Sequence, residues 1–130
     1  MFKRLLICII PILILVSGCG IQKADTMTIR INWISGNCDL CIREPNGREF
    51  WVIDRLSTNG VFSPDAQNGG AETWTLNAKH ADGDYTPLAR SLDYTGPFTL
   101  AVIYNGMKTS ITTSIKAGET IVSTDFLVRR

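Results

Sequence analysis

Two patterns of apolar residues divide the chain. Residues 5–16 form a continuous apolar run, whereas from residue 27 onward apolar and polar residues alternate in short stretches. Alternation with a period of two places every second side chain on the same face of a strand. The segment from residue 27 onward is therefore predicted to form half-buried β-strands, and no stretch in it has a convincing helical period.

The alternation predicts about seven strands, at residues 27–33, 38–43, 50–53, 72–76, 98–104, 110–115 and roughly 120–128. Turn sequences separate them at 44–47 (Glu-Pro-Asn-Gly), 57–60, 105–106 (Asn-Gly) and 117–119. The first and third of these turns predict hairpins. Residues 78–95 are predicted to be a long polar loop. Seven or eight short strands with frequent turns predict an all-β fold, an antiparallel β-sandwich that occupies residues 27–130.

The apolar run at the N-terminus has the features of a secretory signal. Lys3 and Arg4 precede twelve apolar residues, which are too few to span a bilayer as a helix. Residues 15–19, Leu-Val-Ser-Gly-Cys, resemble the bacterial lipobox, an aliphatic residue and two small residues before a cysteine. The resemblance implies that residues 1–18 are a cleaved signal peptide and that the thiol of Cys19 carries a diacylglycerol.

A lipidated Cys19 would anchor the protein to a membrane, with residues 19–26 as a short tether. Each buried methylene contributes about 0.8 kcal/mol, so two or three acyl chains hold firmly. Lipoproteins of Gram-negative cells with Asp after the cysteine stay in the inner membrane, and this chain has Gly20 there. By that resemblance the expected location is the cell envelope, in the outer membrane facing the periplasm if the cell is Gram-negative.

The composition after cleavage fits one small domain and argues against nucleic-acid binding. Removing 18 of 130 residues leaves 112, enough for a single core. The loss of Lys3 and Arg4 from 13 basic residues, against 12 acidic ones, leaves a net charge of −1. There is no basic cluster and no recognisable nucleic-acid-binding motif. The expected partners are the membrane and another envelope protein.

Residues 37–47, Asn-Cys-Asp-Leu-Cys-Ile-Arg-Glu-Pro-Asn-Gly, resemble a family signature. They are similar to the acidic-x-Asp-Leu-x-x-x-x-Pro-Asn-Gly motif of the bacterial YfaP-like domains of unknown function, and more distantly to bacterial pre-peptidase C-terminal domains. Further similar segments follow in order and extend the resemblance over residues 28–128: Trp33, residues 60–65, 70–74, 96–99 and 104–106.

The chain departs from the family pattern at three places. Asn37 stands where the family usually has Asp, Cys41 stands where it often has His, and the loop at 78–95 is longer than usual. The family has no assigned catalysis. The resemblance therefore implies a β-sandwich with an accessory or binding role.

Cys38 and Cys41 form a C-x-x-C pair within a predicted strand. Positions i and i+3 of a strand lie about 10 Å apart on opposite faces, whereas a disulfide needs Cα atoms within about 7 Å. The favoured interpretation places Cys38 in the core and Cys41 toward solvent. A local disulfide would need a bulge, redox catalysis would need a helix N-terminus, and zinc would need partners beyond the distant His80.

Acidic residues offer a candidate ligand or partner surface. Asn37 and Asp39 are predicted on the outward face of their strand, and oxygen donors for calcium could come from the acidic residues of other segments: Asp65, Asp82 and Asp84. The resemblance to pre-peptidase domains also implies calcium at such an edge, with Asp39 and Asp65 as the first candidates. The favoured interpretation, however, is that Asp39 and Asp65 satisfy amides of turns and strand ends and that residues 82–84 form a solvated turn.

The sequence contains no recognisable catalytic motif, and no catalytic residue or cofactor is assigned. Trp33, Trp51 and Trp74 could stack on a sugar if exposed, although core packing is favoured for Trp33 and Trp74. The leading hypothesis is a non-catalytic envelope accessory module that contacts another envelope protein. The alternatives are a calcium- or carbohydrate-binding module and a thiol-dependent protein that uses Cys41.

Overall fold

The computed structural model describes residues 24–129, so the predicted signal peptide, Cys19 and most of the tether lie outside the described part. Within that part the structure contains ten strands and no helix. The strands are β1 (Met27–Trp33), β2 (Cys38–Arg43), β3 (Glu49–Trp51), β4 (Gly60–Phe62), β5 (Gly70–Leu76), β6 (Gly83–Ser91), β7 (Gly96–Tyr104), β8 (Met107–Ile115), β9 (Thr120–Val122) and β10 (Phe126–Val128). No helix in residues 24–129 has the length and apolar character needed to cross a membrane.

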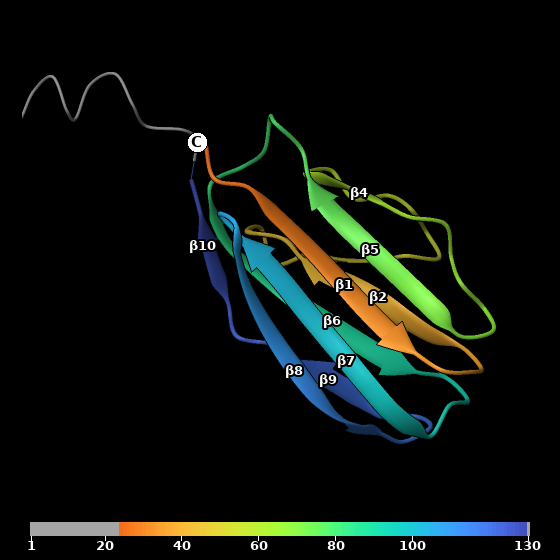
Figure 1. Ribbon diagram of the computed structural model, residues 1–130. Helices are drawn as coiled ribbons and strands as arrows, with labels where there is room; N and C mark the ends of the chain where they lie inside the picture. Colours follow the sequence, from red (N-terminus) through yellow and green to blue (C-terminus); the bar gives the residue numbers. More distant parts are fainter. Residues whose placement is uncertain (1–23, 130) are drawn as a thin grey trace, which may run out of the picture.

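The strands form two antiparallel sheets that pack face to face (Figure 1). The first sheet has the order β4-β5-β1-β7-β8, and the second has the order β10-β6-β2-β3 with β9 also paired to β6. This arrangement confirms the predicted antiparallel β-sandwich, with ten strands instead of seven or eight.

Both hairpins predicted from turn sequences are present. β2 pairs with β3, and the amide of Gly47 donates a 2.8 Å hydrogen bond to the carbonyl of Glu44 across the turn. β7 pairs with β8 along nine residues, and Asn105 and Gly106 between them have φ angles of 50° and 81°. Two consecutive positive φ angles are the requirement of a type I′ turn, which explains the Asn-Gly sequence.

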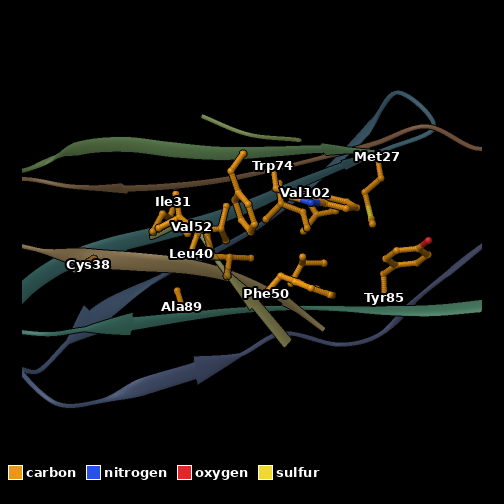
Figure 2. Packing of buried hydrophobic residues seen from close by; sticks show 14 of the residues in the cluster. Met27, Ile31, Cys38, Leu40, Phe50, Val52, Trp74, Tyr85, Ala89 and Val102 are labelled. Carbon is orange, nitrogen blue, oxygen red and sulfur yellow. The ribbon is translucent and has the colours of Figure 1, made fainter. Parts of the chain in front are cut away.

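The core lies between the sheets and is made of the inward-facing side chains of both. Figure 2 shows Met27, Ile31, Trp74 and Val102 from the first sheet meeting Leu40, Phe50 and Tyr85 from the second. Trp74 is fully buried, and its ring lies 5.9 Å from that of Tyr85. The alternation along β1, with Met27, Ile29, Ile31 and Trp33 buried, is the pattern that the sequence predicts.

The predicted loop at residues 78–95 is wrong, because it contains β6, the strand that holds the second sheet together. Pro87, in the middle of β6, makes the segment read as a non-strand, since proline cannot donate to a ladder. The carbonyl of Pro87 accepts from Ser123. Because the N–H and C=O of one residue in an antiparallel strand point to the same side, the missing donor of Pro87 faces the C-terminal segment and leaves the β2 pairing intact.

The prediction of a single strand at 120–128 is also wrong, and Pro87 again accounts for the difference. The segment divides into β9 and β10, which pair with the end and the beginning of β6. Three residues, 123–125, lie between the paired positions Val122 and Phe126, whereas only two lie between Leu88 and Tyr85 on β6. The extra residue is a bulge opposite Pro87.

Candidate functional site

Three carboxylates from distant parts of the chain meet at one edge of the second sheet. Asp39 lies on β2, Asp65 lies between β4 and β5, and Glu72 lies on β5. One carboxylate oxygen from each residue lies within 4.8 Å of the others. The structure thus brings together Asp39 and Asp65, as the sequence suggested, and adds Glu72, which sequence reasoning missed. We call these three residues the acidic cluster.

Glu72 reaches the cluster by crossing from one sheet to the other. Its side chain is on the buried face of β5, and Oε2 accepts a 2.8 Å hydrogen bond from the amide of Leu40 on β2. Oε1 accepts a 3.0 Å hydrogen bond from the amide of Ala66 in the β4–β5 loop. The pairing of β3 with β2 ends at Trp51, beside the amide of Leu40. The ladder between these two strands gives this amide no acceptor, and Glu72 supplies one.

Asp39 is on the outward face of β2, as predicted, but it is fully buried and does not form part of a surface. Its Oδ2 accepts a hydrogen bond from Arg90 on β6, at 3.1 Å from Nη2, and its Oδ1 has no hydrogen-bond partner. The guanidinium of Arg90 in turn lies 4.1 Å from the centre of the Trp51 ring. The side chains of Arg90 and Trp51 therefore cover Asp39, although the alternating sequence pattern alone assigns its outward position to solvent.

Asp65 is half-buried and holds the β4–β5 loop beside Glu72. Its Oδ2 accepts a 3.3 Å hydrogen bond from Gln67. A side-chain hydrogen bond links Asp65 to the neutral form of Glu72, and when Glu72 is ionised the buried Oδ1 of Asp65 has no donor. Asn37 Oδ1 is a third buried side-chain oxygen without a partner among the described residues, two positions before Asp39. Buried oxygens without donors are costly and uncommon in folded proteins, so their concentration near one edge calls for a physical explanation.

Burial sets the charge state of the acidic cluster. It raises the pKa of Glu72 to about 8, an effect that the hydrogen bond from Leu40 opposes and the neighbouring Asp65 increases. Burial also raises the pKa of Asp39, and the hydrogen bond and charge of Arg90 lower it. Burial and the side-chain hydrogen bond with Asp65 therefore favour the neutral form of Glu72. A cation among the three oxygens would favour the ionised form instead.

The other predicted acidic residues do not join this cluster. Asp82 and Asp84 are exposed near the start of β6, whereas Arg90, the partner of Asp39, is near its end. At about 3.3 Å per residue, the six positions from Asp84 to Arg90 correspond to about 20 Å. The five candidates Asn37, Asp39, Asp65, Asp82 and Asp84 therefore do not form one surface.

The expected exposure of Cys41 is wrong. Cys38 and Cys41 are both free and both fully buried. Cys41 faces outward, but Trp51 and Leu88 are its directly opposite neighbours on either side and share its face. Burial raises the pKa of Cys38 to about 11 and that of Cys41 to about 12. Because the thiolate is the reactive form, burial disfavours the reactive state of both thiols in the folded protein.

The remaining candidates serve the fold. Trp33 and Trp74 are core residues, as favoured from the sequence, and the ring of the half-buried Trp51 lies against Arg90. His80 is buried, with Nδ1 2.8 Å from the carbonyl of Asn77 and Nε2 3.3 Å from that of Arg129. Each of these side chains therefore packs against or lies close to other parts of the protein.

A sequence signal for Glu72 does exist. Glu72, Trp74 and Leu76 alternate on the same face of the predicted strand, so an acidic side chain lies on an otherwise apolar face. A charge at a core position must be paired or neutralised, which makes it a candidate for a site.

Comparisons with known protein families, with curated proteins and with solved structures found no match for this chain.

Proposed function

We propose that this protein is a membrane-anchored lipoprotein of the cell envelope and that its β-sandwich is a non-catalytic accessory module that contacts another envelope protein. The lipobox-like leader supports the anchor. The exposed edge strand β8 is the observation that carries the contact role. The proposed location is the outer membrane, facing the periplasm, if the cell is Gram-negative.

β8 is exposed on both faces and along one edge. It is the last strand of the first sheet, and all of its nine residues except Ile115 are exposed. Thr109, Ile111 and Thr113 pair with buried residues of β7 yet remain exposed themselves, so β8 extends beyond the cover of the second sheet. Among residues 24–129 no strand other than β7 pairs with it. A long free edge can accept a strand from another chain.

The composition of β8 favours such a contact. Its residues are mostly Thr, Ser and Ile, which suit a strand, and Lys108 is the one charged residue in it. Met107 is 77% exposed and Ile111 36% exposed, so the surface offers apolar as well as polar contacts. By comparison, the thiol and carbohydrate hypotheses lose support, since Cys41 is buried and Trp51 lies against Arg90.

The start of the described chain suits a short tether. The amide of Asp25 donates to the carbonyl of Arg129 at 3.0 Å, and its Oδ2 accepts from the amide of Arg129 at 2.8 Å. Its Oδ1 accepts a 2.9 Å hydrogen bond from Asn105 in the β7–β8 turn. These bonds hold the first described residues to the domain, so under this proposal the tether from the acyl chains ends at Asp25.

Replacing Cys19 with alanine is expected to abolish membrane anchoring, because the thiol that accepts the diacylglycerol is removed. Mass spectrometry of the native protein should show an acylated Cys19 at the mature N-terminus, and the Cys19→Ala protein should remain an uncleaved precursor or become soluble. Cys8→Ala is the matched control, since Cys8 would leave with the signal peptide. A different mature N-terminus, or an unacylated one, would disprove the anchor.

Photo-cross-linking in living cells tests the contact role. A photoreactive residue at Thr112 on β8 is expected to form an adduct with one envelope protein, and Ile111→Lys should remove it by placing a charge on the edge. The control position is Thr75, which is exposed on β5 within the same sheet. No adduct from Thr112, equal adducts from both positions, or an adduct only with a second copy of the chain would contradict the proposal.

A further inference from the structure

We propose that a hollow on the outer face of the first sheet binds the free carboxylate end of a peptide with apolar last residues. The hollow lies over β1 and its two neighbours in the sheet, β5 and β7 (Figure 1). Its volume is about 500 Å³, within the range of small-molecule sites. The side chains around it belong to Arg30, Asn32, Ile34, Ala71, Pro97 and Thr99. This binding goes beyond the proposed contact at β8 and does not depend on it.

Small residues create the hollow. Asn32 on β1 lies directly between Ala71 of β5 and Thr99 of β7, so these three residues form a row across the sheet. Ala71 contributes only a methyl group to this row, and the preceding Gly70 has no side chain. Larger side chains stand on the two sides of the row, Arg30 on one and Ile34 and Pro97 on the other. The low row between them forms the floor of the hollow.

The polar side chains that line the hollow have free donors. Nε of Arg30 donates a 3.2 Å hydrogen bond to Oδ1 of Asn32, which orients the guanidinium. The two terminal nitrogens of Arg30, Nδ2 of Asn32 and the hydroxyl of Thr99 donate to no other described residue. A carboxylate only accepts hydrogen bonds and can accept several at once. It also matches the fork of a guanidinium with two parallel hydrogen bonds.

The charge of the outer face favours an anionic ligand. Arg30 is in no ion pair with a described residue. The outward positions of the first sheet, which alternate with the buried ones, carry two basic side chains, Arg30 and Lys108, and no acidic one. A negatively charged group is the electrostatic complement of such a face. The carboxylate of the ligand would therefore meet the guanidinium of Arg30.

The opposite side of the hollow favours an apolar group next to the carboxylate. Ile34 is 72% exposed, and Pro97 beside it is exposed as well. Covering these apolar side chains removes them from water. The four positions from Arg30 to Ile34 correspond to about 13 Å, the length of a short extended peptide. Trp33 and Phe98 are buried, so the hollow offers no exposed aromatic ring on which a sugar could stack.

The experiment is an NMR titration of the full chain, purified in mild detergent, with the peptide N-acetyl-alanyl-leucine. The peptide is expected to shift the amide resonances of residues 30–34, 70–71 and 97–99. Its C-terminal amide should bind about tenfold or more weakly, because it lacks the charged acceptor for Arg30. Acetate is the third ligand, and it should bind more weakly than the peptide because it cannot reach Ile34. This arm distinguishes a peptide end from a free small acid.

Arg30→Gln should weaken binding of the peptide acid by about tenfold or more and leave the weak binding of the amide unchanged. The Tm should stay the same, because Arg30 is exposed. Lys108→Gln, which removes the other basic side chain of the same face, is the matched control and should bind like the unsubstituted protein. The proposal would be overturned by an absence of shifts around the hollow, by equal binding of acid and amide, by equal binding of acetate, or by equal losses in the two variants.

Discussion

Replacing Glu44 with alanine is expected to destabilise the folded protein by about 3–5 kcal/mol. Glu44 follows β2 and is only 2% exposed. Its carboxylate accepts four hydrogen bonds from the turn before β4, donated by the hydroxyls of Ser57 and Thr58 and by the backbone and side-chain amides of Asn59. Alanine would leave these donors without their acceptor and open a cavity beside them.

The effect should extend into the core, because Ser57 also accepts a 2.8 Å hydrogen bond from the indole nitrogen of Trp74. Urea or thermal unfolding of the purified protein measures the loss, which corresponds to a fall in Tm of about 15 °C or more for a domain of this size. Glu49→Ala is the control: Glu49 pairs with Arg43 at the surface, and an exposed ion pair contributes about 1 kcal/mol or less. If the two variants unfold alike, Glu44 does not hold the turn.

Replacing Gly60 with alanine should also destabilise the protein, although it adds a single methyl group. A Cβ at position 60 would lie 2.1 Å from Cε2 of Trp74, far inside van der Waals contact. Trp74 is fully buried and packs against Tyr85, so its ring can move aside only if the neighbouring side chains move with it. Overpacking of this kind costs about 1–3 kcal/mol and more where the neighbours are rigid.

The same substitution at Gly106 provides the comparison. Gly106 has open space around it and a φ of 81°, so alanine there meets only backbone strain, at a cost of about 1–2 kcal/mol. Denaturant unfolding should therefore rank Gly60→Ala as the less stable protein, with tryptophan fluorescence altered even before unfolding. Equal stability of the two variants would show that β4 can move away from Trp74 without loss.

The sequence by itself determined the local structure of this protein. The period-two pattern in β1, β5 and β7 predicts those strands because alternation is a property of a few adjacent residues. The Asn-Gly pair at 105–106 predicts the β7–β8 hairpin for an equally local reason, since two positive φ angles favour those residues. The lipobox-like leader is also a local signal, and its role remains a prediction because residues 1–23 lie outside the described part.

The tertiary structure alone decided which residues meet. Alternation states which side chains share a face of one strand, but not which neighbours cover that face, and so Cys41 and Asp39 are buried at outward positions. The sequence did not predict β6 because Pro87 lacks a backbone donor. Whether that loss breaks a strand depends on which neighbour the missing donor would face, and in the fold it faces the C-terminal segment and not β2. Glu72 lies 33 positions after Asp39, and only the packing of β5 over β2 brings their carboxylates together. Local patterns reflect the preferences of the backbone, whereas a binding site depends on long-range contacts that no short stretch of sequence records.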